Sequence, residues 1–377
     1  MVALARRTLI HEWRQFLPAT LAVAFSGVLL LVQGALVLGI FSSASVYVSA
    51  SSADLWIGFP GTQSVELGRP VPEIAELRAR MDPATARVER FQWLDGDWRG
   101  PTDRGGVSVI ITGIDPAPDG LLFAGTLAPA QRALLLEPGT FIIDEADRGK
   151  LGLQVGEYGE LNGHRMRLIA TTRGLRALGG VNVVTSRSTA HLLGAPGAEA
   201  SSMTYLLVKL RDPALAKATR ARLLAIAQTQ RYTVWTRDEF SRRAIEYWLL
   251  DTGAGLGFLL GAAVVVVVGV VITSQTLMSA IAASLREYAT LRALGVGRFD
   301  LGRIVLEKSG WIGGLGVVIG AALATAIVAI ADSQFVPIAV TAWMAIGCAV
   351  LVMVVALISG GLAAQSLRRA DPAMLLR

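Results

Sequence analysis

The chain has 377 residues, of which 53% are hydrophobic and 17% charged, and its formal net charge is +6. Soluble enzymes of ordinary composition carry roughly 25% charged residues, so the composition excludes that class. The apolar residues gather into four uncharged stretches, and a region of ordinary polarity lies between the first and the second. This pattern indicates a membrane protein with one water-exposed domain. Cys348 is the single cysteine, which excludes a disulfide within the chain.

The N-terminal segment, residues 1–17, has one apolar and one basic face at helical spacing. An amphipathic helix of this kind suits the cytoplasmic headgroup layer of a membrane. Pro18 would then begin the following span, because proline is tolerated in a first helical turn. A simple membrane anchor is the alternative. The residues expected at the membrane interface are Arg6, Arg7, Trp13 and Arg14.

Four runs without Asp, Glu, Lys, Arg or His are long enough to cross a bilayer as helices. They cover residues 18–41, 252–277, 310–331 and 338–364. The first run could instead be a cleaved signal peptide, but it exceeds the usual apolar core of about 7–15 residues. The expected fold class is therefore an α-helical membrane protein with four transmembrane helices. A large α+β extracytoplasmic domain, residues 42–251, is inserted between helices 1 and 2.

The orientation follows from Lys and Arg, because positive loops remain in the cytoplasm. These residues occur in 1–17, in 278–309 and in the tail 365–377, whereas the short loop 332–337 has none. Both termini are therefore expected in the cytoplasm. Residues 42–251 carry 24 basic and 23 acidic side chains, so the net charge reflects membrane topology, and we expect no nucleic-acid partner.

The outer segment mixes strand and helix patterns. An Asn162-Gly163 turn predicts a hairpin over residues 157–172. Together these elements predict an α+β domain. Further strands are expected at 107–111, 140–143, 181–185, 205–210 and 232–235, and helices at 72–81 and 213–230.

Two clusters in the outer segment each have two interpretations. Residues 90–99 interleave Phe91, Trp93 and Trp98 with aspartates, which could form a platform for carbohydrate or an adaptor protein, or a hairpin with partly buried aromatic residues. The acidic group 144–147 could bind a cation, or could be a solvated turn that opens a helix. We expect no metal site.

Residues 237–250 place apolar side chains at helical spacing just before the second span. Phe240, Ala244 and Tyr247 lie on this face. The segment could extend the span outward as a stalk, so that one stiff helix carries a cytoplasmic motion to the outer domain.

The spans hold no ionisable group that could carry a coupling proton. Their many glycines suit close helix contact, either in a homodimer or within one chain. The sequence contains no G-x-x-x-x-G-K-[ST] loop and no H-E-x-x-H motif. We therefore expect no catalytic residues and no enzyme activity in this chain, so energy has to come from a partner.

Between spans two and three, residues 284–310 read as helix, glycine break and helix. A short helix at the membrane boundary can dock into the groove of a partner, or it can simply join two spans. The stretch 286–320 resembles the signature of FtsX-like, MacB-type ABC-transporter permeases, R-E-[IF]-[GA]-x-[LM]-[RK]-A-[LI]-G-A followed by a glycine-rich span. The tail 368–373 resembles the family's ending.

The resemblance implies a homodimer that binds two copies of a cytoplasmic ABC ATPase, with ATP and Mg bound by that partner and no cofactor bound by this chain. It also implies a multi-pass protein of the bacterial inner membrane, with residues 42–251 in the periplasm. The residues that it assigns to ATPase coupling are Arg286, Glu287, Tyr288, Leu291, Arg292, Leu294 and Gly295.

A narrower resemblance, over residues 4–36 and 52–57, is to the DevC-type branch of this family. It implies a periplasmic adaptor of the membrane-fusion type, an outer-membrane duct, and export of a lipid, glycolipid or other amphiphile. The alternative is an FtsX-like regulator that transmits motion to a cell-wall hydrolase without moving a substrate.

Overall fold

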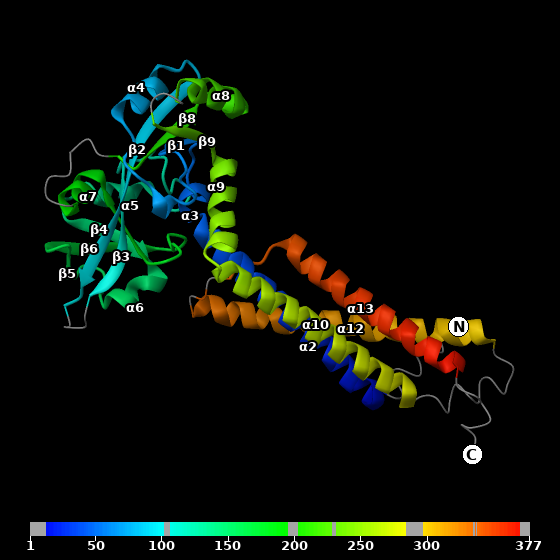
Figure 1. Ribbon diagram of the computed structural model, residues 1–377. Helices are drawn as coiled ribbons and strands as arrows, with labels where there is room; N and C mark the ends of the chain where they lie inside the picture. The colour runs from blue at the N-terminus through cyan, green and yellow to red at the C-terminus, as the bar shows by residue number, and fades with distance from the viewer. Residues whose placement is uncertain are drawn as a thin grey trace. The chain divides into compact units, whose positions relative to one another are not determined.

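The computed structural model describes residues 13–101, 106–194, 203–227, 231–283, 297–334, 336 and 338–369 (Figure 1). The chain divides into two compact units. We call the unit Met1–Gly39 with Leu256–Arg377 the helical unit, and the unit Ile40–Gly255 the outer domain.

The helical unit contains four helices that are long and apolar enough to cross a membrane by length and composition. The prediction of four such helices is therefore confirmed for the part of the chain that the structure describes. They are α2 (Trp13–Ala44), α10 (Ala254–Ala283), α12 (Arg298–Ser333) and α13 (Ala342–Arg369).

Two helix boundaries differ from the sequence expectations. Helix α2 runs through Pro18, so Trp13 belongs to the same helix and is not on a separate interfacial segment that ends before the proline. Helix α13 begins at Ala342 and not at 338, because Thr341 acts as its N-cap and accepts a hydrogen bond from the Met344 N–H at 3.4 Å. The Ala339 N–H bonds the carbonyl of Ala35 at 3.1 Å, which fixes this non-helical entry against α2.

Glycines allow α12 to approach α2 closely. A Cβ at Gly316 would lie 2.6 Å from the Val23 side chain, and a Cβ at Gly320 would lie 2.8 Å from the carbonyl oxygen of Ala24. Such small residues at i and i+4 let two helix backbones meet. The glycines of α12 therefore serve packing within one chain, which was one of the two interpretations of the pattern.

Hydroxyl groups connect the other helices of this unit. The Thr273 hydroxyl on α10 donates to Ser26 Oγ on α2 at 3.1 Å. Ser274 on α10 and Ser359 on α13 share a hydrogen bond of 2.7 Å. Both bonds lie between long apolar helices, where a hydroxyl group gains most from a partner on the neighbouring helix.

The first and the last part of the outer-domain sequence fold together into one split β-α-β arrangement, which we call the ferredoxin-like half. Its strands follow the order β2-β8-β1-β9 and all their pairings are antiparallel. Helices α4 and α8 cover one face. The elements are β1 (Leu55–Gly58), α4 (Glu73–Met81), β2 (Thr85–Arg99), β8 (Tyr205–Leu210), α8 (Ala216–Ala227) and β9 (Thr233–Thr236).

The segment between β2 and β8 folds into a second half. Its strands pair in the order β2-β3-β7-β4-β6-β5, and β5 pairs again with β2, so they close into a small barrel. We call this part the barrel. Trp98 and Phe141 lie inside it with ring centroids 5.4 Å apart. The strands are β3 (Val107–Ile114), β4 (Thr140–Asp144), β5 (Tyr158–Leu161), β6 (His164–Thr172) and β7 (Val181–Ser186).

Short helices complete the domain. Two of them, α3 and α9, lie beside the ends of the long apolar helices in the sequence. The remaining elements are α3 (Val46–Ser49), η1 (Val65–Leu67), α5 (Pro129–Leu134), η2 (Glu145–Asp147), α6 (Arg148–Leu151), α7 (Arg187–Leu193), η3 (Pro213–Leu215), α9 (Arg237–Glu246) and η4 (Tyr247–Asp251), which is a π-helical turn.

Most elements predicted for the outer segment are confirmed, including the hairpin, in which Leu161 pairs with His164 across Asn162-Gly163. Residues 90–99 are not an exposed platform, and the interpretation as part of a hairpin with buried or half-buried aromatic residues is confirmed, because residues 92–98 pair antiparallel with the next strand, β3. They belong to one 15-residue strand, β2, which pairs with β8 through its first half and with β3 through its second. Phe91 and Trp98 are fully buried because β2 contributes to the cores of both halves.

The contact of α12 with α2 predicts different effects for two glycines. Replacing Gly320 by valine should lower the stability of the helical unit by about 1–3 kcal/mol, because the new side chain would meet the backbone of Ala24. Gly347 on α13 has open space within 4 Å of its Cβ position, so Gly347→Val is the matched control. Thermal unfolding of the purified protein in detergent should separate the variants, and equal stability would contradict this packing.

Candidate functional site

The predicted ATPase-coupling residues, 286–295, lie outside the described residues, and so do Arg6 and Arg7. The other two interface residues lie near the start of α2, where both are exposed and the Arg14 guanidinium lies 5.7 Å from the centre of the Trp13 ring. Lys308 on α12 is buried, with its ammonium group 5.2 Å from the centre of the Phe16 ring. This contact places a cation against the same end of α2.

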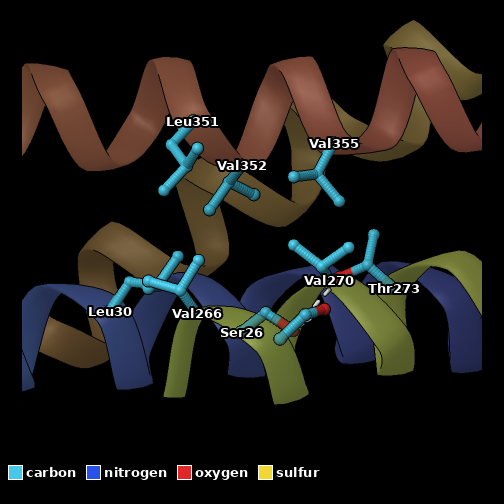
Figure 2. A pocket seen from close by; sticks show the side chains of 9 residues that line it. Ser26, Leu30, Val266, Val270, Thr273, Leu351, Val352 and Val355 are labelled. Carbon is cyan, nitrogen blue, oxygen red and sulfur yellow. Dashed lines mark hydrogen bonds between the residues drawn. The ribbon is translucent and has the colours of Figure 1, made fainter. Parts of the chain in front are cut away.

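A small pocket lies among α2, α10 and α13 in the helical unit (Figure 2). Its polar atoms already have partners, since Ser26 Oγ donates to the carbonyls of Ala22 and Gly269 and accepts from Thr273. The pocket therefore suits only an apolar group and has no means to hold a polar substrate. Its lining residues are Ser26, Leu30, Val266, Gly269, Val270, Thr273, Leu351, Val352 and Val355.

The predicted stalk residues lie on α9, the stem of the outer domain. Helix α9 begins with a capping box, in which the Glu239 N–H donates to Thr236 Oγ1 and the Thr236 N–H donates to the Glu239 carboxylate. Arg220 on α8 pairs with the same carboxylate at 2.8 Å. The start of the stem is thus fixed to the ferredoxin-like half by a local and a long-range contact.

The side chain of Phe240 joins the stem to an aromatic core. Phe240 is fully buried and stacks on Trp235 of β9, with ring centroids 4.6 Å apart and an interplanar angle of 7°. Trp56 and Tyr205 lie 5.6 and 5.8 Å from it. Ala244, one turn further, is also buried. This part of the stem is therefore a packed helix of the domain and not a free stalk.

The same core also receives the segment that follows α2. Tyr47 on α3 is fully buried, 6.1 Å from Phe91 and 6.0 Å from Phe123. The Arg237 side chain at the start of α9 donates to the carbonyl of Ser49 at 2.5 Å. The chain therefore enters and leaves the outer domain through two helices that share one aromatic core.

The stem is not continuous with α10, which corrects the expectation of one stiff helix. After α9 the backbone forms the π-helical turn Tyr247–Asp251, and Gly253 then has a φ of 72°, in the left-handed region. A Cβ at Gly255 would lie 2.4 Å from the Cα of Leu249, so the chain folds tightly back on the turn. Both glycines are needed because L side chains fit neither position well.

A mostly buried carboxylate lies beside this turn. Glu66 of η1 accepts a hydrogen bond from the Ser64 hydroxyl, but no ion pair to it is seen within the described ranges. Burial raises the pKa of Glu66 above its usual value, and the bond from Ser64 and the nearby Trp248 indole oppose this shift only in part. Its charge also contributes to the raised pKa of Tyr47 and Tyr205.

Several buried polar atoms around Glu66 lack a hydrogen-bond partner among the residues described by the structure: the Tyr47 hydroxyl, Trp93 Nε1, Trp248 Nε1 and one oxygen of Glu66. Such atoms are unfavourable in a protein interior and often mark a functional constraint. No sequence pattern indicated Glu66, because its burial arises from the packing of η1, α3 and the turn.

The acidic group 144–147 forms a capped turn. The Asp144 carboxylate accepts hydrogen bonds from the N–H groups of Ala146, Gly174 and Leu175. Asp147 pairs with Lys150 at 2.7 Å. The group is therefore a turn that opens a helix, as one interpretation expected, but it is not solvated, since Asp144 and Asp147 are buried. In the described part of the chain no three His, Cys, Asp or Glu side chains gather closely enough to hold a metal ion.

Comparison with known proteins gives one family match. Residues 259–372 match the family model described as FtsX-like permease C-terminal. The matched segment contains most of α10 and all of α12 and α13, so these helices are similar to an FtsX-like permease domain. The match supports the FtsX-like part of the resemblance, but it does not include the N-terminal segment, so the DevC-type branch stays a prediction.

Two solved structures are similar to parts of the chain. The periplasmic region of MacB from Actinobacillus actinomycetemcomitans is 12% identical, covers 52% of this chain and 94% of its own, and gives a TM-score of 0.36. The extracellular domain of the noncanonic ABC-type transporter YknZ from Gram-positive bacteria is 13% identical, covers 49% of this chain and 100% of its own, and gives a TM-score of 0.34. Comparison with curated proteins found no match.

The tight turn after the stem predicts opposite effects for two neighbouring glycines. Gly255→Ala should destabilise the outer domain, because its methyl group would overlap the backbone of Leu249. Gly257→Ala, two residues later, meets open space and should be neutral or slightly stabilising. Thermal unfolding followed by tryptophan fluorescence tests both variants. A Gly255→Ala protein as stable as Gly257→Ala would contradict the close approach.

The buried Glu66 predicts a pH dependence. Because its pKa is raised in the folded state, folding favours the protonated form, so this contribution to stability is present below the ordinary glutamate pKa and is lost as pH rises through the folded pKa. Glu66→Gln should therefore be more stable than the native protein at neutral pH, and the difference should vanish in acid. Unfolding midpoints measured between pH 4 and pH 8 check this, and a constant difference would contradict it.

Proposed function

We propose that this chain is the membrane subunit of an ABC transporter of the FtsX-like, MacB type, which couples ATP hydrolysis by a separate cytoplasmic ATPase to movement of the outer domain. The observation that carries this proposal is the family match over residues 259–372. The four apolar helices and the mixed α/β outer domain are what such a subunit requires.

In this proposal the four helices span the bacterial inner membrane with both chain ends in the cytoplasm. The distribution of Lys and Arg supports that orientation, since the segments 1–17, 278–309 and 365–377 carry the positive charge. Two copies of the chain would form a homodimer and would bind two ATPase subunits. ATP and Mg would be bound by those subunits.

The aromatic core suits the outer domain to receive motion from both connections. Phe240 anchors α9 and Tyr47 anchors α3 in the same cluster of rings. Aromatic packing of this density moves as one body, because closely packed interiors transmit displacement. A tilt of α2 would therefore act on a packed domain through α3, whereas a tilt of α10 would act first on the turn Tyr247–Asp251.

Within this function we propose export of a lipid, glycolipid or other amphiphile, together with a periplasmic adaptor of the membrane-fusion type and an outer-membrane duct. The DevC-like residues 4–36 and 52–57 and the size of the outer domain support this finer proposal. The chain's own contribution would be mechanical, and the apolar lining of the pocket among α2, α10 and α13, with its hydroxyl groups already hydrogen-bonded, supports this.

Purification of the tagged protein from its native membrane, with mass spectrometry of what co-elutes, tests the proposal. A Walker-motif ATPase together with a periplasmic adaptor would support the exporter. Recovery of the ATPase together with a cell-wall hydrolase would instead support a regulator of that hydrolase that exports nothing. Recovery without an ATPase would overturn the proposed function.

The proposed coupling segment makes a sharper prediction. Leu291→Asp or Leu294→Asp should abolish ATPase co-purification and coupled ATP hydrolysis, while the protein still inserts into the membrane. The reason is that a charge would replace an apolar side chain that docks into the groove of the ATPase. Leu136→Asp, the same substitution at a residue of the outer domain that is 67% exposed, should leave both intact. Normal coupling in the first two variants would exclude this docking site.

A further inference from the structure

The turn Tyr247–Asp251 is held by side chains and backbone from both halves of the outer domain. Gln63, in the loop after β1, donates from Nε2 to Oδ2 of Asp251 at 3.0 Å. In the same loop, the Glu66 carboxylate lies beside the Trp248 indole. From the barrel, Gly179 approaches the Trp248 ring, which lies 3.8 Å from the position of a Cβ at that glycine.

The loop that carries Gln63 and Glu66 is itself firmly fixed. The Tyr205 hydroxyl on β8 donates to the carbonyl of Val65 at 2.9 Å. Gly68 is pressed against the start of the same strand, because a Cβ there would lie 2.4 Å from the side chain of Thr204 and 2.5 Å from the Tyr205 hydroxyl. The loop is therefore anchored to β8 by close packing and a hydrogen bond, which makes it a support for the turn.

The turn, in contrast, has an unfavourable local structure. A π-helical turn is rare and occurs often at functional sites. Here it is followed by Gly253 in the left-handed region. Neither Trp248 Nε1 nor the second oxygen of Glu66 has a hydrogen-bond partner in the described part of the chain. Such a conformation persists only where its surroundings hold it.

We propose that Gln63, Glu66 and Gly179 form a releasable clasp on the turn Tyr247–Asp251, with Trp248 wedged between the two halves of the outer domain. When the clasp opens, the turn changes its backbone conformation and the Trp248 ring withdraws from the barrel loop. The clasp concerns the outer domain alone and does not depend on an ATPase partner.

The chemistry of the contacts fits release. The bond between Gln63 and Asp251 is exposed to solvent, so water can replace it at small cost. The Glu66 carboxylate is mostly buried and has no ion pair within the described residues, so opening of the turn, which would admit water, relieves part of its desolvation cost. The closed form is therefore held by a few weak contacts, as a switch between two states requires.

Amide hydrogen exchange of the full-length protein in lipid nanodiscs tests the clasp. Gln63→Ala should raise exchange across residues 245–256 by about threefold, which corresponds to the loss of one exposed hydrogen bond, and should leave residues 140–172 unchanged. Gln131→Ala is the matched control. It also removes one glutamine hydrogen bond, from Nε2 to the Thr171 carbonyl at 3.4 Å, and both residues are far from the stem in the sequence. It should not change exchange in 245–256.

Two further variants keep the test specific. Asp251→Ala combined with Gln63→Ala should have no greater effect than either change alone, because both remove the same bond. Trp248→Ala should raise exchange both in the turn and in residues 173–180, which contain Gly179. Unchanged exchange in 245–256 for Gln63→Ala, or an equal rise over the whole domain, would overturn the clasp, and unchanged exchange in 173–180 for Trp248→Ala would overturn the wedge.

Discussion

The stacking of Phe240 on Trp235 is the contact on which the arrangement of the outer domain depends. It fixes the stem helix to β9, and β9 is an edge strand of the ferredoxin-like half. In the adjacent strand, β1, successive side chains point to opposite faces of the sheet. Leu55 and Ile57 therefore pack beneath α4 and α8, while Trp56 contacts the stem on the other face. The sheet thus has two separate cores, and the one that contacts the stem is aromatic.

Aromatic residues suit this position because large flat rings exclude alternative packings. Ring pairs contribute about 0.5–1.5 kcal/mol beyond their buried area. The rings of Trp56, Phe91, Tyr205 and Phe240 make several such pairs with one another. A small aliphatic core would tolerate sliding of α9 along the sheet. The cluster of rings fixes the stem in one position, so displacement at its end can be passed to the barrel through β2, which belongs to both halves.

Much of this fold could be predicted from local patterns. Runs of β-branched residues marked most strands, and the Asn162-Gly163 turn fixed the register of its hairpin. Local patterns failed where long-range packing decides. The aromatic pattern in 90–99 did not show that the strand extends from Thr85 to Arg99 and pairs with β8 as well as with β3, because β8 lies more than 100 residues further along the chain. The role of Glu66 was equally hidden, since nothing near it in sequence signals a buried carboxylate.

The two connections of the outer domain differ in their backbone structure. Between α2 and α3 the helical backbone is interrupted only at Ser45, and Val46, Tyr47 and Val48 of α3 are buried in the aromatic core. Between α9 and α10 the backbone passes through a π-helical turn and a left-handed glycine. The entry to the outer domain is therefore a nearly continuous helix packed on the aromatic core, whereas the exit passes through a turn at which the backbone leaves helical geometry.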